Sequence, residues 1–151
     1  MGDVRVLQMR NPEAVASSIV QELFSRAFKK DEHGDAIEAW EWCNQFLQHP
    51  GMAFLVALDE ESSLVGMAVG LDERNVWNPD PFVLHIYSEG RDVFNALLSA
   101  LREWAFSRGA SKLGCINMTG HSDEAHMRSI REFAEGSIVG SLISYDLKDI
   151  E

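Results

Sequence analysis

The spacing of apolar residues in the first third of the chain predicts one short strand followed by two helices. Residues 4–9 favour the strand, residues 12–28 a helix that Asn11 caps, and residues 35–47 a second helix. Each predicted helix carries one apolar stripe, which marks the face that it buries. The stripes consist of Val15, Ile19, Val20, Leu23, Phe24 and Ala27 in the first helix, and of Ile37, Trp40, Cys43 or Asn44, and Leu47 in the second.

The middle of the chain changes to the spacing of strands. Residues 52–59 and 63–71 are apolar runs rich in β-formers, and the acidic turn between them predicts a hairpin of two buried strands. A turn with two prolines at residues 78–81 precedes a third run, residues 82–87. We therefore expect three consecutive strands.

The longest helix is predicted over residues 91–108, with Gly109 at its C-terminal stop. A strand over 112–117, a helix over 122–133 and a strand over 137–147 complete the chain. The predicted order is β-α-α-β-β-β-α-β-α-β in one domain, residues 1–151. Because a strand–helix–strand crossover is parallel and a hairpin antiparallel, we expect an α/β fold with a mixed sheet.

Composition narrows the function classes. The 151 residues carry a formal net charge of −11, which disfavours binding to nucleic-acid phosphates. The sequence shows neither a membrane-spanning run nor a signal peptide, so we expect a cytoplasmic protein that does not bind membranes. Cys43 and Cys115 lie far apart without His partners at metal spacing, and His121 and His126 would face different ways on a helix. We expect two reduced, buried thiols and no metal site.

The order of elements and four stretches in the second half resemble the GNAT N-acyltransferases. These stretches are FVLHIY, the glycine loop SEGRD, the helix end WAFSRGA and the strand KLGCIN. The resemblance covers nearly the whole chain, and it looks closest to the GNAT-like proteins of tailed phages. It implies a three-layer domain that transfers an acetyl or longer acyl group from acyl-CoA to an amine of a small molecule or protein.

The resemblance also implies where coenzyme A would bind, namely where the turn after the fourth strand presents backbone N–H groups at a helix N-terminus. The candidate cofactor-binding residues are Ile86, Ser88, Gly90, Arg91, Asp92, Val93 and Asn117. The turn departs from the family pattern. Glu89 replaces an Arg or Gln, while Asp92 and Phe94 replace small residues. Each carboxylate would repel a phosphate 4 Å away by about 1 kcal/mol in water, and the ring of Phe94 would occupy the phosphate path.

Candidate catalytic groups follow from the same resemblance. A β-bulge within residues 84–86 would turn out a backbone N–H that polarises the thioester carbonyl. The last helix lacks the tyrosine with which many GNAT enzymes protonate the thiolate, although Ser129 could hold a water there. His85 and Tyr87 share one face of a strand, where they could serve as base and acid or simply as polar tips of packed side chains.

A second hypothesis belongs to another class. The chain would be a catalytically inactive, phage-encoded GNAT-fold protein that has lost acyl-CoA binding and binds a protein partner. Trp42 lies off its helical stripe and Trp77 lies in a loop, so either could anchor such a partner, and Phe28 is a further candidate. If the chain is an enzyme instead, its acidic surface suits a cationic amine such as a polyamine, an aminoglycoside or a lysine.

Overall fold

The computed structural model describes residues 3–15, 17–28 and 36–115, all of which belong to one compact unit, Met1–Ile116. The predicted helix 122–133, the predicted strand 137–147, Ser129 and Asn117 lie outside the described residues. The prediction of one domain over 1–151 therefore stays a prediction.

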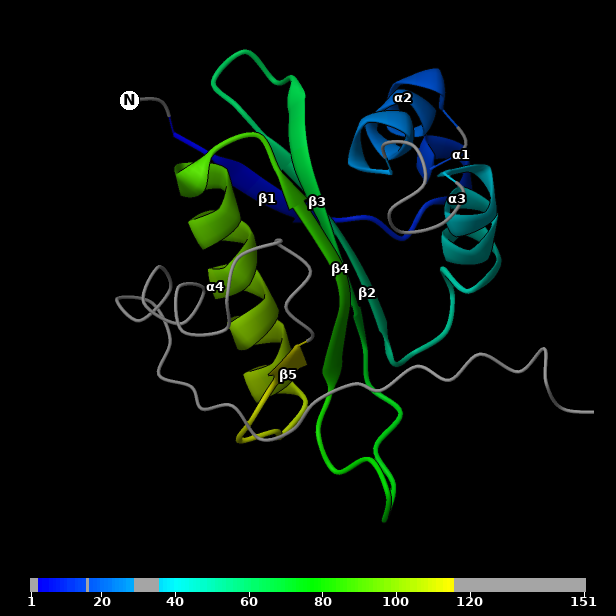
Figure 1. Ribbon diagram of the computed structural model, residues 1–151, viewed down its shortest axis with the longest axis vertical. Coiled ribbons are helices and arrows are strands. Elements are labelled where there is room, and N and C mark those ends of the chain that lie inside the picture. The colour runs from blue at the N-terminus through cyan, green and yellow to red at the C-terminus, as the bar shows by residue number, and fades with distance from the viewer. Residues whose placement is uncertain (1–2, 16, 29–35, 116–151) are drawn as a thin grey trace, which may run out of the picture. The chain divides into compact units, whose positions relative to one another are not determined.

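A five-stranded sheet forms the centre of this unit (Figure 1). Its strands follow one another in chain order across the sheet. They are β1 (Arg5–Gln8), β2 (Met52–Leu58), β3 (Leu64–Leu71), β4 (Phe82–Ser88) and β5 (Gly114–Cys115). β1 to β4 pair antiparallel, and β5 pairs parallel with β4 after a helical crossover. The predicted mixed sheet is confirmed.

Helices cover both faces of the sheet and make three layers (Figure 1). On one face lie α1 (Pro12–Val15), α2 (Ser18–Ala27) and α3 (Ala36–Gln45), and on the other lies α4 (Arg91–Ser107). β2 is buried on both faces, because Phe54 and Val56 pack toward α1–α3 while Leu55 and Ala57 pack toward α4. This explains why the sequence of β2 is an unbroken apolar run.

The predicted helix 12–28 is two helices rather than one. The chain breaks at Ser17, whose Oγ accepts a hydrogen bond from the Val20 N–H at 3.4 Å and caps α2. The break resets the helical phase, so Ile19 is 61% exposed, contrary to its place on the predicted stripe. Ile37, in the first turn of α3, is likewise exposed (66%). The remaining stripe residues of these helices that the structure describes are buried or half-buried.

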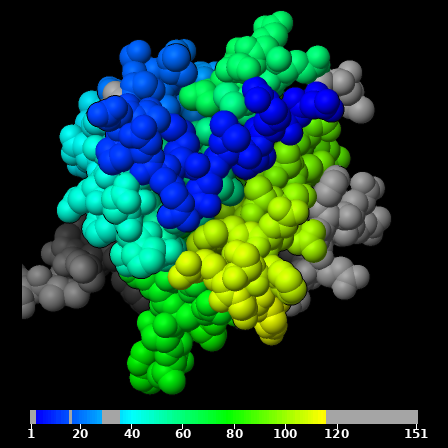
Figure 2. Space-filling view, turned by 180° about the vertical axis from the view of Figure 1, so that it is seen from behind, coloured from blue at the N-terminus to red at the C-terminus, as the bar shows by residue number. Residues whose placement is uncertain are grey.

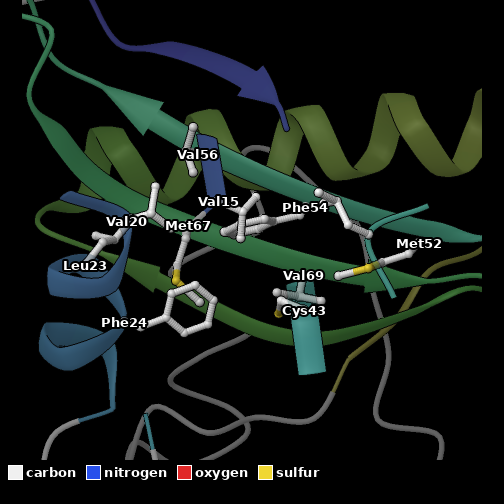
Figure 3. Packing of buried hydrophobic residues seen from close by; sticks show 11 residues of the cluster. Val15, Val20, Leu23, Phe24, Cys43, Met52, Phe54, Val56, Met67 and Val69 are labelled. Atoms are coloured by element: carbon white, nitrogen blue, oxygen red, sulfur yellow. The ribbon is translucent and has the colours of Figure 1, made fainter. Parts of the chain in front are cut away.

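The core between α1–α3 and the sheet is aromatic and aliphatic (Figure 3). The rings of Phe24 and Phe54 meet edge to face, with centroids 5.7 Å apart. Cys43 belongs to this core, and burial raises the pKa of its thiol to about 12, so it stays protonated. Cys115 is exposed, so the prediction of two buried thiols is wrong for that residue.

The core under α4 depends on two glycines of β3 that let the helix approach closely. A Cβ atom on Gly66 would lie 2.7 Å from Cγ1 of Val93, and one on Gly70 would lie 2.7 Å from the ring of Trp104. Leu97 and Leu101 fill the space between them. This close packing fixes α4, and therefore its N-terminus, against β3 and β4.

No helix in the described ranges is long and apolar enough to span a bilayer.

Candidate active site

A one-residue β-bulge interrupts β4 at Leu84. On β3, Val69 pairs with His85 while its neighbour Gly70 pairs with Val83, so Leu84 is the extra residue on β4. A bulge of this kind leaves the extra residue unpaired and disrupts the ladder locally. The bulge predicted within residues 84–86 is therefore confirmed.

The bulge also shifts the alternation of side chains along β4. Val83 and Ile86 both pack against α4 although they are three residues apart, whereas a regular strand would put them on opposite faces. His85 and Tyr87 consequently face the α1–α3 side together, as predicted, where they meet residues of α2. Ile86 thus directs its side chain into the core and offers a ligand only its backbone.

β4 and β5 pair over a short distance. Within the described residues, the ladder joins only Phe82 with Gly114 and Val83 with Cys115, and both pairs precede the bulge. β4 continues through Ser88, which still pairs with Gly66 of β3 on its other side. Along the described chain, the β5-facing edge of β4 after the bulge has no strand partner.

Glu89 and Gly90 connect this edge directly to α4. Gly90 is the N-cap of α4, has φ +129°, and provides no side-chain cap. A Cβ atom built on Gly90 would find no atom within 4 Å, so the space above the loop is open. The first helical hydrogen bond runs from the Phe94 N–H to the Gly90 carbonyl at 3.1 Å. Helix geometry directs the preceding amides, residues 91–93, out of the helix end, where the dipole favours an anion.

The side chains of the first turn of α4 divide between solvent and core. Arg91 and Asp92 are exposed at the open loop, and Val93 is buried under the helix. Phe94 is half-buried. Of the predicted cofactor-binding residues, Ser88, Gly90, Arg91 and Asp92 therefore gather at the loop, while Val93 can contribute only its N–H.

Glu89 does not present an uncompensated charge to the loop. Its carboxylate lies 2.6 Å from Nη1 of Arg26, and the same guanidinium donates from Nη2 to the Leu64 carbonyl at 3.0 Å. The hydroxyl of Tyr87 donates to Glu89 Oε2 at 2.9 Å. The repulsion of phosphate that the sequence predicts at Glu89 is thereby weakened, whereas Asp92 remains an exposed carboxylate beside the open space.

The two candidate catalytic residues of β4 have different surroundings. Burial and the neighbouring Glu89 carboxylate raise the pKa of Tyr87, and Arg26 lowers it by less, so the phenol stays protonated. The ring of His85 stacks on Phe28 at the end of α2, with centroids 4.4 Å apart. The stacking favours the interpretation of His85 as a packed side chain, while Tyr87 keeps a polar hydrogen at the site.

A small groove lies on the sheet beside the bulge, at the opposite end of β4 from the glycine loop. It has a volume of about 280 Å³ and is lined by Leu71, Glu73, Asn78, Phe82 and Leu84. The β3–β4 loop projects past the end of the sheet next to it (Figures 1 and 2). Trp77 in this loop is 92% exposed. Trp42, the other predicted anchor, is half-buried against Phe46.

Comparison with solved structures decides the fold. Neither a protein-family model nor a curated protein sequence matches the chain. Among solved structures, the aminoglycoside N-acetyltransferase AAC(6')-Iy, in complex with a bisubstrate analogue of CoA and an acetylated neamine, superposes with a TM-score of 0.70 at 17% identity. The alignment covers 95% of this chain and 97% of that one. The chain has the GNAT fold.

Two further GNAT-fold structures align over 95% of this chain and 97% of their own chains. The aminoglycoside 6'-N-acetyltransferase AAC(6')-Ih from Acinetobacter baumannii gives a TM-score of 0.70 at 10% identity. An aminoglycoside acetyltransferase from an uncultured soil metagenomic sample, in complex with sisomicin, gives 0.62 at 15% identity. At these identities the similarity establishes the architecture, and function must be argued from the residues of this chain.

Proposed function

We propose that this GNAT-fold protein is an N-acyltransferase that binds acetyl-CoA or a longer acyl-CoA along β4 and the α4 N-terminus. The acyl group would pass to an amine of a small molecule or protein. The observation that carries the proposal is the bulge at Leu84 followed, on the same strand, by an open glycine loop at a helix N-terminus. Two solved structures of one neighbour, AAC(6')-Iy, contain CoA or a bisubstrate analogue of it, which supports this function over that of a non-catalytic interaction protein.

The chain's own groups fit the diphosphate of coenzyme A at the loop. Gly90 leaves room for a close approach, and the N–H groups of residues 91–93 supply donors with a favourable dipole. Arg91 is exposed at the same turn, where its guanidinium can pair with a phosphate oxygen. Asp92 opposes binding from the same turn, so we expect micromolar rather than tighter affinity, about −8 kcal/mol.

The proposed chemistry is direct attack of the amine on the thioester carbonyl. The nitrogen lone pair forms the new C–N bond, and the carbonyl oxygen takes up charge that a backbone amide left unpaired by the bulge at Leu84 would stabilise. Collapse then breaks the C–S bond, the nitrogen loses a proton to solvent, and the departing thiolate gains one. Because Tyr87 stays protonated and lies on the strand that carries the bulge, we propose it as the proton donor.

The decisive experiment is calorimetric titration with acetyl-CoA at low salt. The wild type should bind saturably with a micromolar dissociation constant, and Arg91→Glu should weaken binding at least tenfold. Arg102→Glu is the matched control, because Arg102 is an exposed arginine farther along the same helix. Reversing its charge should change the affinity for acetyl-CoA less than about twofold. The absence of saturable binding at a few millimolar acetyl-CoA would refute the proposal.

Tyr87→Phe separates catalysis from binding. Loss of a general acid typically costs about 10²-fold or more in kcat, while the dissociation constant of acetyl-CoA should stay within about twofold. Single-turnover kinetics with saturating acetyl-CoA measure the two separately. An unchanged kcat would show that solvent protonates the thiolate, and would leave Tyr87 a structural partner of Glu89.

A further inference from the structure

The groove beside the bulge has a position that matters for acyl transfer. Leu84 is both the extra residue of the bulge and a wall of the groove. On the proposed function, the thioester carbonyl would meet the backbone amide left unpaired by the bulge at Leu84. A nucleophile held in the groove would therefore approach that carbonyl from the end of β4 opposite to the glycine loop.

The lining of the groove combines an apolar floor with one carboxylate. Leu71, Phe82 and Leu84 supply the apolar surface, and Leu84 is 42% exposed. Glu73 is the acidic residue among the described lining residues, and its side chain is mostly exposed, with Nε2 of His49 at 3.7 Å. Asn78 adds one amide to the lining, so a ring or alkyl chain can cover most of the groove, whereas a ligand with many hydroxyls would leave some of them without partners, which is costly.

The groove is also small and its rim is ordered. Its volume of about 280 Å³ falls below the roughly 300–1,000 Å³ of sites that enclose drug-sized ligands. Asn75 fixes the rim, because its N–H donates to the Asn78 carbonyl at 2.8 Å and its Oδ1 accepts from the Asn78 N–H at 2.9 Å. A rim held in this way is suited to a compact ligand of defined shape.

We infer that this groove is the acceptor site and that it selects a small primary amine carried on an apolar body, such as an arylalkylamine or an alkylamine. The amine nitrogen would lie between Glu73 and Leu84, bound as an ammonium that loses one proton to solvent before it attacks, and the ring or chain would cover Leu71 and Phe82. Charge complementarity supports this occupant, because Glu73 is acidic and the whole chain carries −11. The inference rests on the proposed acyltransfer, and it separates this chain from the neighbours that are aminoglycoside acetyltransferases.

Steady-state release of free thiol from saturating acetyl-CoA tests the selectivity. In the series from methylamine to hexylamine, kcat/KM should rise about three- to fourfold per methylene until the groove is filled. 2-Phenylethylamine should exceed kanamycin by at least tenfold. Rates that do not depend on chain length, or a clear preference for kanamycin, would overturn the inference while leaving the acyltransferase proposal intact.

Glu73→Gln tests the position of the ammonium. It should raise KM for 2-phenylethylamine about two- to fivefold, because Glu73 is largely exposed, with little change in kcat or in acetyl-CoA affinity. Glu60→Gln, in the exposed turn between β2 and β3, removes the same charge and should change nothing. Equal effects of the two variants would contradict the assignment.

Direct titration of 2-phenylethylamine without CoA distinguishes the two possible failures. Binding that Glu73→Gln weakens supports the groove even if acetyl-CoA fails to bind and the proposed function falls. If acetyl-CoA binds and 2-phenylethylamine shows no Glu73-dependent binding or turnover, the acceptor inference alone is overturned.

Discussion

The two ends of α4 are built in opposite ways. At the C-terminal end, Arg108 donates to Asp72 Oδ2 at 2.6 Å and to the Pro50 carbonyl at 2.9 Å. Arg74 donates hydrogen bonds to both carboxylate oxygens of Asp72 and to the Arg108 carbonyl, the last at 2.6 Å. At the N-terminal end, Gly90 caps the helix without a side chain and faces open space.

The contrast separates stability from binding along one helix. The closed end satisfies every oxygen of a carboxylate that is 4% exposed, so it fastens the helix to the ends of β2 and β3. The open end leaves helix amides available to a ligand, and the ion pair of Arg26 with Glu89 beside it is about one-third exposed and contributes little to stability. Substitutions at the two ends should therefore change different observables.

Asp72→Ala should have the largest effect, and it should act on stability. Removing the carboxylate leaves Arg74 and Arg108 without their shared partner, which we expect to cost about 3 kcal/mol in free energy of unfolding and to lower Tm by roughly 10 °C. Asp92→Ala, at the open end, should cost less than about 1 kcal/mol. Thermal and urea unfolding measure both, and equal losses would remove the distinction between the two ends.

The ion pairs of Asp72 with Arg74 and Arg108 also make the free energy of unfolding depend on pH. Burial alone would raise the pKa of Asp72, but the hydrogen bonds and charges of Arg74 and Arg108 outweigh burial and hold the pKa below 3.8. A group whose pKa is lower in the folded state than in the unfolded state stabilises the fold fully at pH values above its unfolded-state pKa. This stabilisation is lost as the pH falls through the folded-state pKa. Between about pH 5 and pH 2, the wild type should therefore lose unfolding free energy more steeply than Asp72→Ala.

Gly90→Ala should have an intermediate effect that falls on ligand binding. The methyl group meets no protein atom, but it would enter the space proposed for the diphosphate, so acetyl-CoA affinity should fall at least tenfold. Gly109→Ala is the matched control at the other end of α4. Gly109 also has positive φ (+80°) and open surroundings. Gly109→Ala should lose about 1 kcal/mol of stability from backbone strain, and Gly90→Ala up to about 3 kcal/mol, because its φ of +129° and ψ of 162° lie in a region that only glycine adopts readily. If Gly109→Ala weakened acetyl-CoA binding as much, the effect would be general strain rather than a blocked site.

Sequence patterns predicted the α4 side of the molecule better than the α1–α3 side. The stripe of α4 repeats over a long helix, and Val93, Leu97, Leu101 and Ala105 are buried as expected. In α1 and α2 the apolar positions continue in nearly helical phase across Ser17, so periodicity does not reveal the break that its capping hydroxyl makes. Short helices give a periodic pattern too few turns to fix its phase.

The sequence predicted the candidate site only in part, because some of its contacts join residues far apart in the chain. The glycine loop and the strand before it are local in sequence, and the bulge was expected from the family resemblance rather than from any residue. The partner of Glu89 was missed, because Arg26 lies 63 residues away and no spacing rule connects them. The groove was missed as well, since Leu71 and Leu84 become neighbours only when β3 pairs with β4.

Glu89→Gln gives the smallest and most discriminating effect. If Arg26 fully compensates Glu89, the substitution should leave acetyl-CoA affinity unchanged; if compensation is partial, it should tighten binding. We expect a two- to fivefold gain at low salt that fades as ionic strength rises, because the freed Arg26 guanidinium adds a positive charge near the loop. Calorimetry at two salt concentrations measures this, with Glu103→Gln on the exposed face of α4 as control. A loss of affinity would show that Glu89 organises the loop, and that the open end depends on its ion pair as the closed end depends on Asp72.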